Sequence, residues 1–245
     1  MRFRTTVGLT LLLFLLAALF ARLGAWQLER MAQKEQLFQR FDSAPALTLA
    51  EAIDSETRFA RVRAWGRFDT ARHLLLDNRI HRGRPGVHVL TPFHTNDGRT
   101  VLVNRGWLPL AADRRVLPDV PTDGSPREIS GRLTPLGSTG LRLGEADELR
   151  ADTWPQLVTW LDHEPAERAL GINLEHWVIL LDARQSDGFA ARGWQPSTME
   201  PATHGAYALQ WFSLAATAIV IWILLGLRRG RVAVNDNETT NGDTR

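Results

Sequence analysis

One run of residues limits the fold more than any other feature of this sequence. Residues 207–227 contain no charged side chain over 21 positions. A helix rises about 1.5 Å per residue, so this run would cover about 31 Å, close to the thickness of the hydrocarbon core of a bilayer. Trp211 and Trp222 lie towards its two ends, as aromatic residues at membrane interfaces do. The run predicts a transmembrane helix, and a buried core helix is the weaker alternative.

A second apolar run lies near the N-terminus, where residues 7–26 carry only one charge, Arg22. Two interpretations compete, a retained membrane anchor and a cleaved signal peptide, because Arg2 and Arg4 precede the run as they do in signal peptides. Residues 19–21 form a poor cleavage site, since a large residue stands where a small one is needed and an arginine follows. The sequence therefore favours the retained anchor.

The arginines that flank the two spans predict the topology. Arg2 and Arg4 precede the first span, and Arg228, Arg229 and Arg231 follow the second. The positive-inside rule places both chain ends in the cytoplasm and the middle on the other side, in the periplasm of a bacterial inner membrane or in a mitochondrial intermembrane space. The expected segments are a cytoplasmic N-terminus (1–6), a first span (7–26), an extramembrane domain (27–206), a second span (207–227) and a disordered cytoplasmic tail (228–245).

Short β-like stretches dominate the middle of the chain. Residues 61–68 alternate apolar side chains with arginines, which indicates a strand with one buried face. The turn Asn96-Asp97-Gly98 between two β-rich runs predicts an antiparallel hairpin. The other expected elements are strands at 73–77, 86–93, 128–133 and 177–181, helices at 29–41 and 165–170, and loops at 111–126 and 138–152. The predicted fold class is an α+β membrane protein in which two transmembrane helices flank a mainly antiparallel β domain with a few helices.

Composition and motifs exclude several classes of function. The formal net charge of +2 gives no reason to expect a nucleic-acid partner, and the absence of cysteine removes disulfides and thiolate metal sites. No P-loop, GxSxG or HExxH motif occurs, so the sequence does not support an enzyme. Six of the seven histidines are expected to be surface or structural residues: His73, His81, His88, His94, His163 and His176.

The remaining histidine, His204, stands directly before the second span. If the helix begins at Pro201, His204 lies in its first turn, on one face with Tyr207 and Trp211. A helix N-terminus favours a neutral imidazole, which can ligate iron, and also favours anions such as haem propionates.

The end of the first span offers a matching face formed by Leu23, Trp26, Gln27, Arg30 and Lys34. An apolar wall that leads to two cations suits an amphiphilic ligand with carboxylates. The alternative is that these residues, His204 included, are ordinary interfacial anchors.

Four stretches together resemble the surfeit locus protein 1 family, also called the Shy family. They are residues 23–30 with Lys34, residues 66–69 with 75–79, residues 85–109, and residues 199–212. The most specific stretch contains Asn104-Arg105-Gly106-Trp107. Order and spacing agree over nearly the whole chain. The sequence departs from the family at Val87, where an aromatic residue is usual, and residues 111–170 match only loosely.

The resemblance implies a non-enzymatic assembly factor for haem-copper cytochrome c oxidase. Such a protein would bind haem a, assist its insertion into the catalytic subunit, and work with oxidase subunit I and the haem a synthesis enzyme. His204 matches the family's proposed haem ligand. From the helix-face argument, Trp26, Gln27, Arg30, Tyr207 and Trp211 are candidate pocket walls and propionate contacts.

Several alternatives stay open beside this expectation. The Asn104-Arg105-Gly106-Trp107 segment is either a structural turn or a contact for a partner protein. The chain as a whole is a haem-binding chaperone, a haem-free scaffold that stabilises a subunit I intermediate, or, least supported, a membrane-anchored enzyme. Both a monomer and a homo-oligomer are compatible with the sequence.

Overall fold

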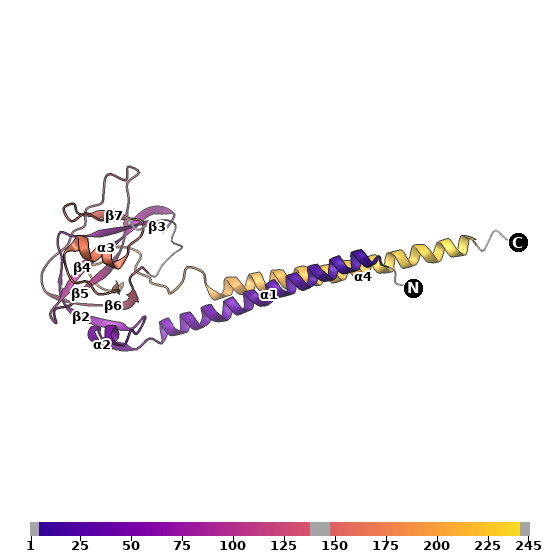
Figure 1. The fold of residues 1–245 in the computed structure, drawn as a ribbon, viewed down its shortest axis with the longest axis horizontal. Helices are drawn as coiled ribbons and strands as arrows, with labels where there is room; N and C mark the ends of the chain where they lie inside the picture. Colours follow the sequence, from indigo (N-terminus) through magenta and orange to yellow (C-terminus); the bar gives the residue numbers. More distant parts are fainter. Residues whose placement is uncertain (1–4, 138–147, 241–245) are drawn as a thin grey trace. The chain divides into compact units, whose positions relative to one another are not determined.

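The computed structural model describes residues 5–137 and 148–240. The chain divides into two units, a helix pair (Met1–Gln39 with Pro196–Arg245) and a β-rich domain (Arg40–Gln195). Figure 1 gives the order of the elements along the chain. The predicted fold class is confirmed: two apolar helices near the chain ends flank a mainly antiparallel β domain with a few helices, which makes this an α+β membrane protein.

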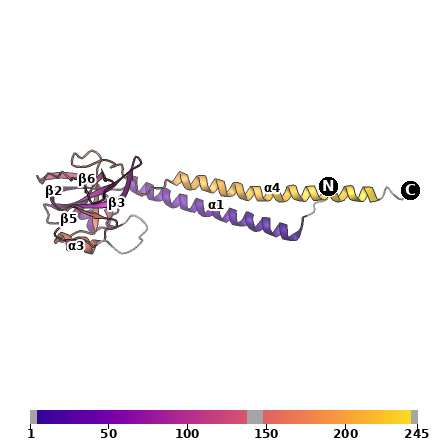
Figure 2. The ribbon, with the colours of Figure 1, turned by 90° about the horizontal axis from the view of Figure 1, so that it is seen from above.

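The helix pair consists of α1 (Val7–Asp42) and α4 (Pro201–Thr240), which run side by side in Figures 1 and 2. His204 at the start of α4 contacts Gln27 of α1, whereas Trp222 in the middle of α4 donates a hydrogen bond to Thr10 near the start of α1, so the two helices are antiparallel. Both are long and apolar enough to cross a membrane. Most of their large apolar side chains, such as Leu11 and Ile219, are exposed, which suits a lipid environment rather than the core of a soluble domain.

Side chains that recur at alternating steps of three and four residues form the seam between the helices. On α1 these are Thr10, Leu13, Ala17, Phe20, Gly24, Gln27, Met31 and Lys34; on α4 they are His204, Ala208, Trp211, Ala215, Ala218 and Trp222. All are buried or half-buried between exposed neighbours. This spacing is typical of helices that cross at a small angle, and the small residues in it allow the close approach common in membrane helix pairs.

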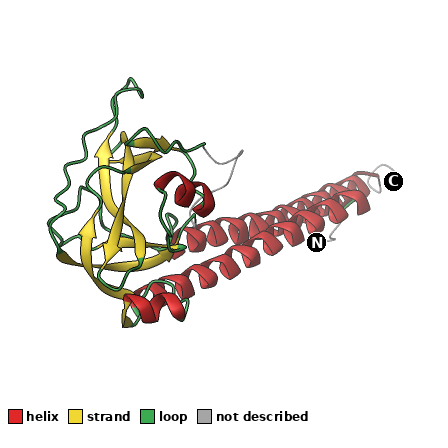
Figure 3. Cartoon of the chain, turned by 60° about the vertical axis from the view of Figure 1, so that its left-hand side comes forward, coloured by secondary structure: helices red, strands yellow, loops and turns green. Residues whose placement is uncertain are grey.

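The domain is built on a sheet that closes on itself. Its strands follow the order β1 (Ala46–Thr48), β2 (Arg61–Phe68), β6 (Arg127–Pro135), β8 (Trp177–Leu181), β5 (Thr100–Pro109), β4 (Arg84–Thr95), β3 (Leu74–His81) and β7 (Gln156–Val158). β2 also pairs with β4, so five strands form a barrel and the remaining three extend it. Five of the eight strand pairings are antiparallel. Figure 3 shows the strands gathered into one curved body.

Apolar side chains fill the barrel and cover part of its outside. The inner core joins alternate residues of β2, such as Val62 and Phe68, to Phe93, and α2 (Leu49–Asp54) adds Leu49 and Ile53. A second cluster packs Ala166 and Leu170 of α3 (His163–Leu170) against outward residues of β3, β4, β5 and β8. The outer face of β6 carries polar residues, and that of β2 carries three arginines and Trp65.

The strongest sequence signals gave the most accurate predictions. The strands at 61–68 and 177–181 have the predicted bounds, and the hairpin at Asn96-Asp97-Gly98 joins β4 to β5. The helix at 29–41 is the continuation of α1, and α4 begins at Pro201 as expected. Ten of the fifteen residues of the expected loop at 138–152 lie outside the described residues, at positions 138–147.

Three elements were not predicted, and one segment differs from expectation. β1 and β7 are too short to show a period, whereas α2 carries a sequence signal: Thr48 and Glu51 form a capping box. A disordered tail is expected for residues 228–245, but α4 continues to Thr240. No proline interrupts residues 228–240, so the helical hydrogen bonds can continue. Residues 241–245 lie outside the described part of the chain.

Candidate functional site

His204 occupies the first turn of α4 and is turned into the seam of the helix pair. Its side chain is buried, with 8 % exposure. Pro201 begins the helix, a position where proline's fixed φ angle and missing N–H are favourable. His204 Nδ1 lies 2.8 Å from Oε1 of Gln27 on α1. A carboxamide oxygen only accepts, so Nδ1 is the protonated nitrogen in this arrangement.

The other ring nitrogen, Nε2 of His204, is enclosed and has no hydrogen-bond partner among the described residues. With the proton on Nδ1, Nε2 carries a lone pair. A buried acceptor without a donor costs about 1–3 kcal/mol, so native proteins rarely retain one without a reason. A neutral imidazole whose second nitrogen is held by a hydrogen bond is also the common arrangement of a metal-ligating histidine. Chemically, the arrangement presents one oriented electron-pair donor inside an apolar seam.

Close helix contacts surround this histidine on both sides. A Cβ atom on Gly24 would lie 2.8 Å from the ring of Phe212, and one on Gly205 would lie 3.0 Å from Sδ of Met31. Both glycines therefore permit a helix approach that alanine would obstruct. Two turns further along α4 from His204, Trp211 stacks on Phe20 of α1 with a ring separation of 5.8 Å. These contacts were not predicted, although the three-and-four spacing of Phe20, Gly24, Gln27 and Met31 could have revealed the seam.

The structure brings some of the predicted site residues together and separates others. Gln27 and Trp211 lie in the seam with His204. Trp26 and Tyr207 are 45 % and 46 % exposed, on the outside of the helix pair. Arg30 is exposed and donates to Gln33 on its own helix.

Lys34, at the end of the seam, donates a 2.7 Å hydrogen bond to Ser197 Oγ. Sequence reasoning placed Lys34 on this face but gave no role to Ser197.

The Asn104-Arg105-Gly106-Trp107 segment lies in β5 and is bound into the domain through every member. Arg105 is 3 % exposed; it donates to the backbone oxygens of Asp187 and Pro121 and to Thr122 Oγ1. Its guanidinium also lies over the rings of Phe68 and Phe189, at 5.0 and 4.8 Å. Burial lowers the pKa of Arg105 to about 10, against the attraction of Asp187, so the side chain stays charged at neutral pH.

The neighbours of Arg105 are equally constrained. Asn104 accepts a hydrogen bond from the backbone N–H of Gly106, and Trp107 donates to the backbone oxygen of Arg79. Gly106 has φ +107°, and a Cβ atom there would lie 2.5 Å from the oxygen of Ala190. These contacts hold the segment within the domain as part of strand β5, and not in the turn that was one of the expectations.

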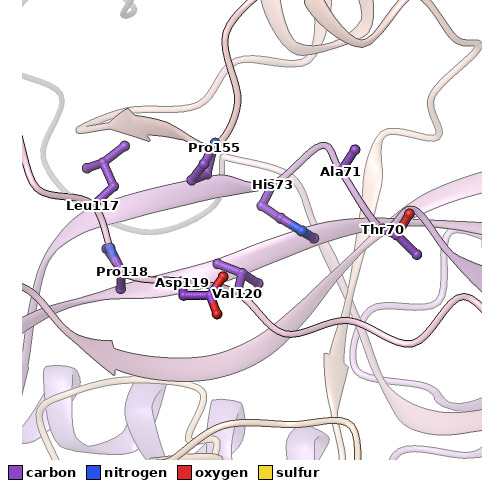
Figure 4. A pocket seen from close by; sticks show the side chains of 8 residues that line it. All are labelled: Thr70, Ala71, His73, Leu117, Pro118, Asp119, Val120 and Pro155. Atoms are coloured by element: carbon purple, nitrogen blue, oxygen red, sulfur yellow. The ribbon is translucent and has the colours of Figure 1, made fainter.

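The domain histidines also take structural positions. Burial lowers the pKa of His88 to about 4, with a further contribution from the nearby charge of Arg79. His73 lies 3.1 Å from Thr91 Oγ1, and burial lowers its pKa too. His73 borders an open hollow of about 390 Å³, with Asp119 and Pro155 on its walls (Figure 4). Among the described residues, no group of three or more His, Asp or Glu side chains could hold a metal ion.

Comparisons with known proteins agree with this architecture. A family model described as "SURF1 family" matches residues 14–216. A SURF1-like protein of Rickettsia felis is 28 % identical over 222 residues, covering 86 % of this chain and 93 % of that protein. Surfeit locus protein 1 of Xenopus tropicalis is 25 % identical over 246 residues, covering 91 % of this chain and 77 % of the other, and that of Mus musculus is 24 % identical over 237 residues, covering 89 % and 75 %. The fold and the seam define a membrane protein whose two apolar helices are joined by polar contacts at His204–Gln27 and Trp222–Thr10. The chain belongs to the SURF1 family.

Proposed function

We propose that this protein is an assembly factor for haem-copper cytochrome c oxidase that binds haem a through His204 and assists its insertion into the catalytic subunit. The proposal depends on the different environments of the two ring nitrogens of His204. Nδ1 is hydrogen-bonded to Gln27, whereas the buried Nε2 has no hydrogen-bond partner among the described residues. Membership of the SURF1 family supports the role as an assembly factor, and the hydrogen bonding of the His204 ring supports His204 as the haem ligand.

The residues around His204 are of the chemical types that a haem-binding site needs. The lone pair on Nε2 of His204 would be available to ligate the iron of a bound haem. Gln27 would fix the ring orientation and keep the proton on Nδ1, so that Nε2 stays available. Trp211 and Phe20 supply an apolar wall, and Arg30 and Lys34 supply cations for carboxylates.

Access to Nε2 requires the groups that enclose it to move. The seam on either side contains Gly24, Gly205 and Ala208. The small side chains let the helices approach closely, so opening the site would break van der Waals contacts and the hydrogen bond between His204 and Gln27. Closing of the helices would restore these contacts when the cargo passes to the oxidase.

The proposal assigns a non-enzymatic role, with oxidase subunit I and the haem a synthesis enzyme as partners. It places the chain in a bacterial inner membrane with both ends in the cytoplasm and the β domain in the periplasm. Arg2, Arg4 and the arginines at 228, 229 and 231 support that orientation. Fusing alkaline phosphatase to the β domain is expected to give an active enzyme, and fusing it after residue 234 is expected to give an inactive one.

The decisive experiment is the visible spectrum of the detergent-purified chain, co-expressed with the haem a synthesis enzymes. We expect a low-spin haem a spectrum for the wild type and its loss or a change of spin state in His204→Ala. His81→Ala, a histidine substitution in the β domain, is the matched control and should keep the wild-type spectrum. If His204→Ala retains the spectrum unchanged, the ligand assignment is wrong.

A haem-free scaffold is the alternative function. It predicts no haem band in either protein under the same conditions. The two functions also separate in cells. With haem transfer, His204→Ala should lower the haem content of the oxidase while subunit I still co-purifies; with scaffolding, the substitution should affect neither.

A further inference from the structure

The outer face of β2 carries a row of side chains that no other element covers. Along Arg61–Phe68, exposed and buried residues alternate strictly. The buried set fills the barrel, and the exposed set is Arg61, Arg63, Trp65 and Arg67. Trp65 is 53 % exposed, an unusual position for the largest apolar side chain. We call these four residues the β2 face.

The arginines of the β2 face are not neutralised by any other residue that the structure describes. No ion pair or hydrogen bond from another described residue reaches the guanidinium of Arg61, Arg63 or Arg67. In contrast, Arg127 on the neighbouring strand forms ion pairs with Asp123 and Asp187. The β2 face therefore presents three free positive charges on one strand.

Cross-strand pairing adds a like-charge contact at one end of this face. Arg61 stands directly opposite Arg132 of β6. Like charges at directly opposite positions destabilise a sheet. Burial, and then the charge of Arg61, lower the pKa of Arg132, whereas Asp182 and Asp42 act in the other direction. An anion bound to the β2 face would relieve this repulsion.

Shape gives the second, independent observation. A hollow of about 600 Å³ lies beside Arg61 and Arg63, bordered by β1 and β6. Another of about 220 Å³ lies beside Arg63 and Trp65, bordered by α2 and the β4–β5 turn. Alternate residues of a strand are about 7 Å apart, so the four side chains form a line about 20 Å long. An extended peptide repeats its own alternate side chains at the same interval.

We propose that the β2 face binds an extended acidic segment of a partner protein, with alternate Asp or Glu side chains against Arg61, Arg63 and Arg67 and an apolar residue against Trp65. A bilayer of anionic lipid is the competing occupant. It fits less well because Glu51, Asp182 and Asp97 border the two hollows, and a uniformly negative surface would meet these carboxylates as well as the arginines. A threaded peptide can place its charges on the arginines alone. The inference is independent of haem binding.

The test uses the full-length chain in nanodiscs of zwitterionic phosphatidylcholine. The probe is a fluorescent peptide whose alternate positions carry aspartate, aspartate, valine and aspartate, to match Arg61, Arg63, Trp65 and Arg67, and the same peptide with asparagine for aspartate is the uncharged control. Fluorescence anisotropy over a salt series is expected to show binding of the acidic probe that weakens as salt rises, and little binding of the control peptide.

Charge reversal then locates the site. The triple variant Arg61→Glu, Arg63→Glu, Arg67→Glu should lower probe affinity at least about tenfold, because each exposed ion pair contributes up to about fivefold. Trp65→Ala should lower it less, with little change in salt dependence. Arg84→Glu, which reverses an exposed arginine in β4 near the β3–β4 turn, is the matched control and should bind like the wild type. Thermal unfolding checks that the variants fold; Arg61→Glu would replace a repulsion with an attraction to Arg132.

Two outcomes would overturn the proposal. The first is equal probe affinity in the wild type and the triple variant. The second is binding to phosphatidylglycerol vesicles that the triple variant loses while the peptide probe binds neither protein, which would assign the β2 face to lipid.

Discussion

The β domain and the helix pair treat a buried polar side chain in opposite ways. In the domain, Arg105 is almost fully buried, and it has three hydrogen-bond acceptors and two aromatic rings around it. In the helix pair, His204 is nearly as buried, yet one of its two nitrogens has no partner within the described residues. Arg105 is explained by the fold that it stabilises. His204 is not, which is why it is the better candidate for function.

Arg79 sharpens this contrast, because its Nε is also enclosed without a partner in the described structure. A guanidinium has several N–H groups, and the side chain of Arg79 is only half-buried, so its other nitrogens can reach water. A neutral imidazole has a single acceptor, and in His204 that acceptor is the atom left without a donor. A buried polar atom without a hydrogen-bond partner therefore indicates a binding site only where no other atom of the side chain can make the hydrogen bond instead.

The largest expected effect is on the domain. Arg105→Ala should lower the free energy of unfolding by about 3–5 kcal/mol, because it removes a buried charge and leaves its acceptors without donors. Thermal or urea unfolding of the full chain measures this. Arg115→Ala, which removes a 90 % exposed arginine paired with Asp113, should change stability by no more than about 0.5 kcal/mol. Similar losses in both variants would contradict the structural role assigned to Arg105.

Next in size is the backbone at Gly106. Gly106→Ala should cost about 3 kcal/mol or more, since it combines a positive φ with a close approach to the oxygen of Ala190. Gly83→Ala provides the comparison: its φ is also positive, but nothing lies within 4 Å of the added Cβ, so about 1 kcal/mol is expected. The difference between the two unfolding free energies measures the close approach alone. Equal costs would mean that β5 can shift to admit the methyl group.

A pH effect of intermediate size is expected from His88, whose pKa is lowered from 6.5 to about 4. Between pH 6.5 and pH 4, His88 is protonated in the unfolded chain but neutral in the folded chain. Its contribution to the free energy of unfolding is therefore complete above pH 6.5 and is lost as pH falls towards 4. Allowing for partial exposure, the loss is about 2 kcal/mol. His73 and His94, whose pKa values burial also lowers, add to the same slope. Unfolding of His88→Gln should therefore show a shallower pH dependence than the wild type, and an identical slope would contradict the burial of His88.

The smallest expected effect on stability is in the helix pair. His204→Leu removes an acceptor without a donor, which favours stability, and also removes the hydrogen bond to Gln27, which opposes it. Because the two effects offset each other, the stability of the pair should change by no more than about 1 kcal/mol. Loss of helical circular dichroism during titration with sodium dodecyl sulfate measures this. Ala208→Leu, at the next seam position, is the control for crowding and should destabilise the pair. A loss of about 2 kcal/mol or more in His204→Leu would mean that the hydrogen bond to Gln27, or a partner of Nε2, stabilises the pair more than the buried acceptor destabilises it.

The sequence predicted interactions between residues that are close together in the chain better than interactions between distant residues. The alternation in β2, the Asn96-Asp97-Gly98 turn and the apolar run of α4 are local patterns, and each gave the right element. The helix-face argument also selected His204 and Gln27 separately, on two helices 177 residues apart. It could not select their contact, because that depends on how α1 rotates against α4. For the same reason it grouped Trp26 and Tyr207 with them, although both side chains are exposed.

Long-range contacts account for the rest. Arg105 reaches an acceptor 82 residues away, and the sequence contains no pattern that joins the two. The sequence therefore identified the motif Asn104-Arg105-Gly106-Trp107, but only the fold showed which residues these four contact. The four residues of the β2 face were visible as an alternation, and only the sheet order showed that their outer side is uncovered.

The ends of the sheet have a consequence for a protein proposed to work beside unassembled oxidase subunits. β1 and β7, the outermost strands, are three residues each; β1 leads directly into α2, and Pro155 directly precedes β7. A long, flat edge strand offers free backbone groups that pair with exposed segments of incompletely folded chains and so seed aggregation. Barrel closure and short outer strands leave little such template. If the proposed function is correct, such a sheet would give immature partners little edge on which to co-aggregate.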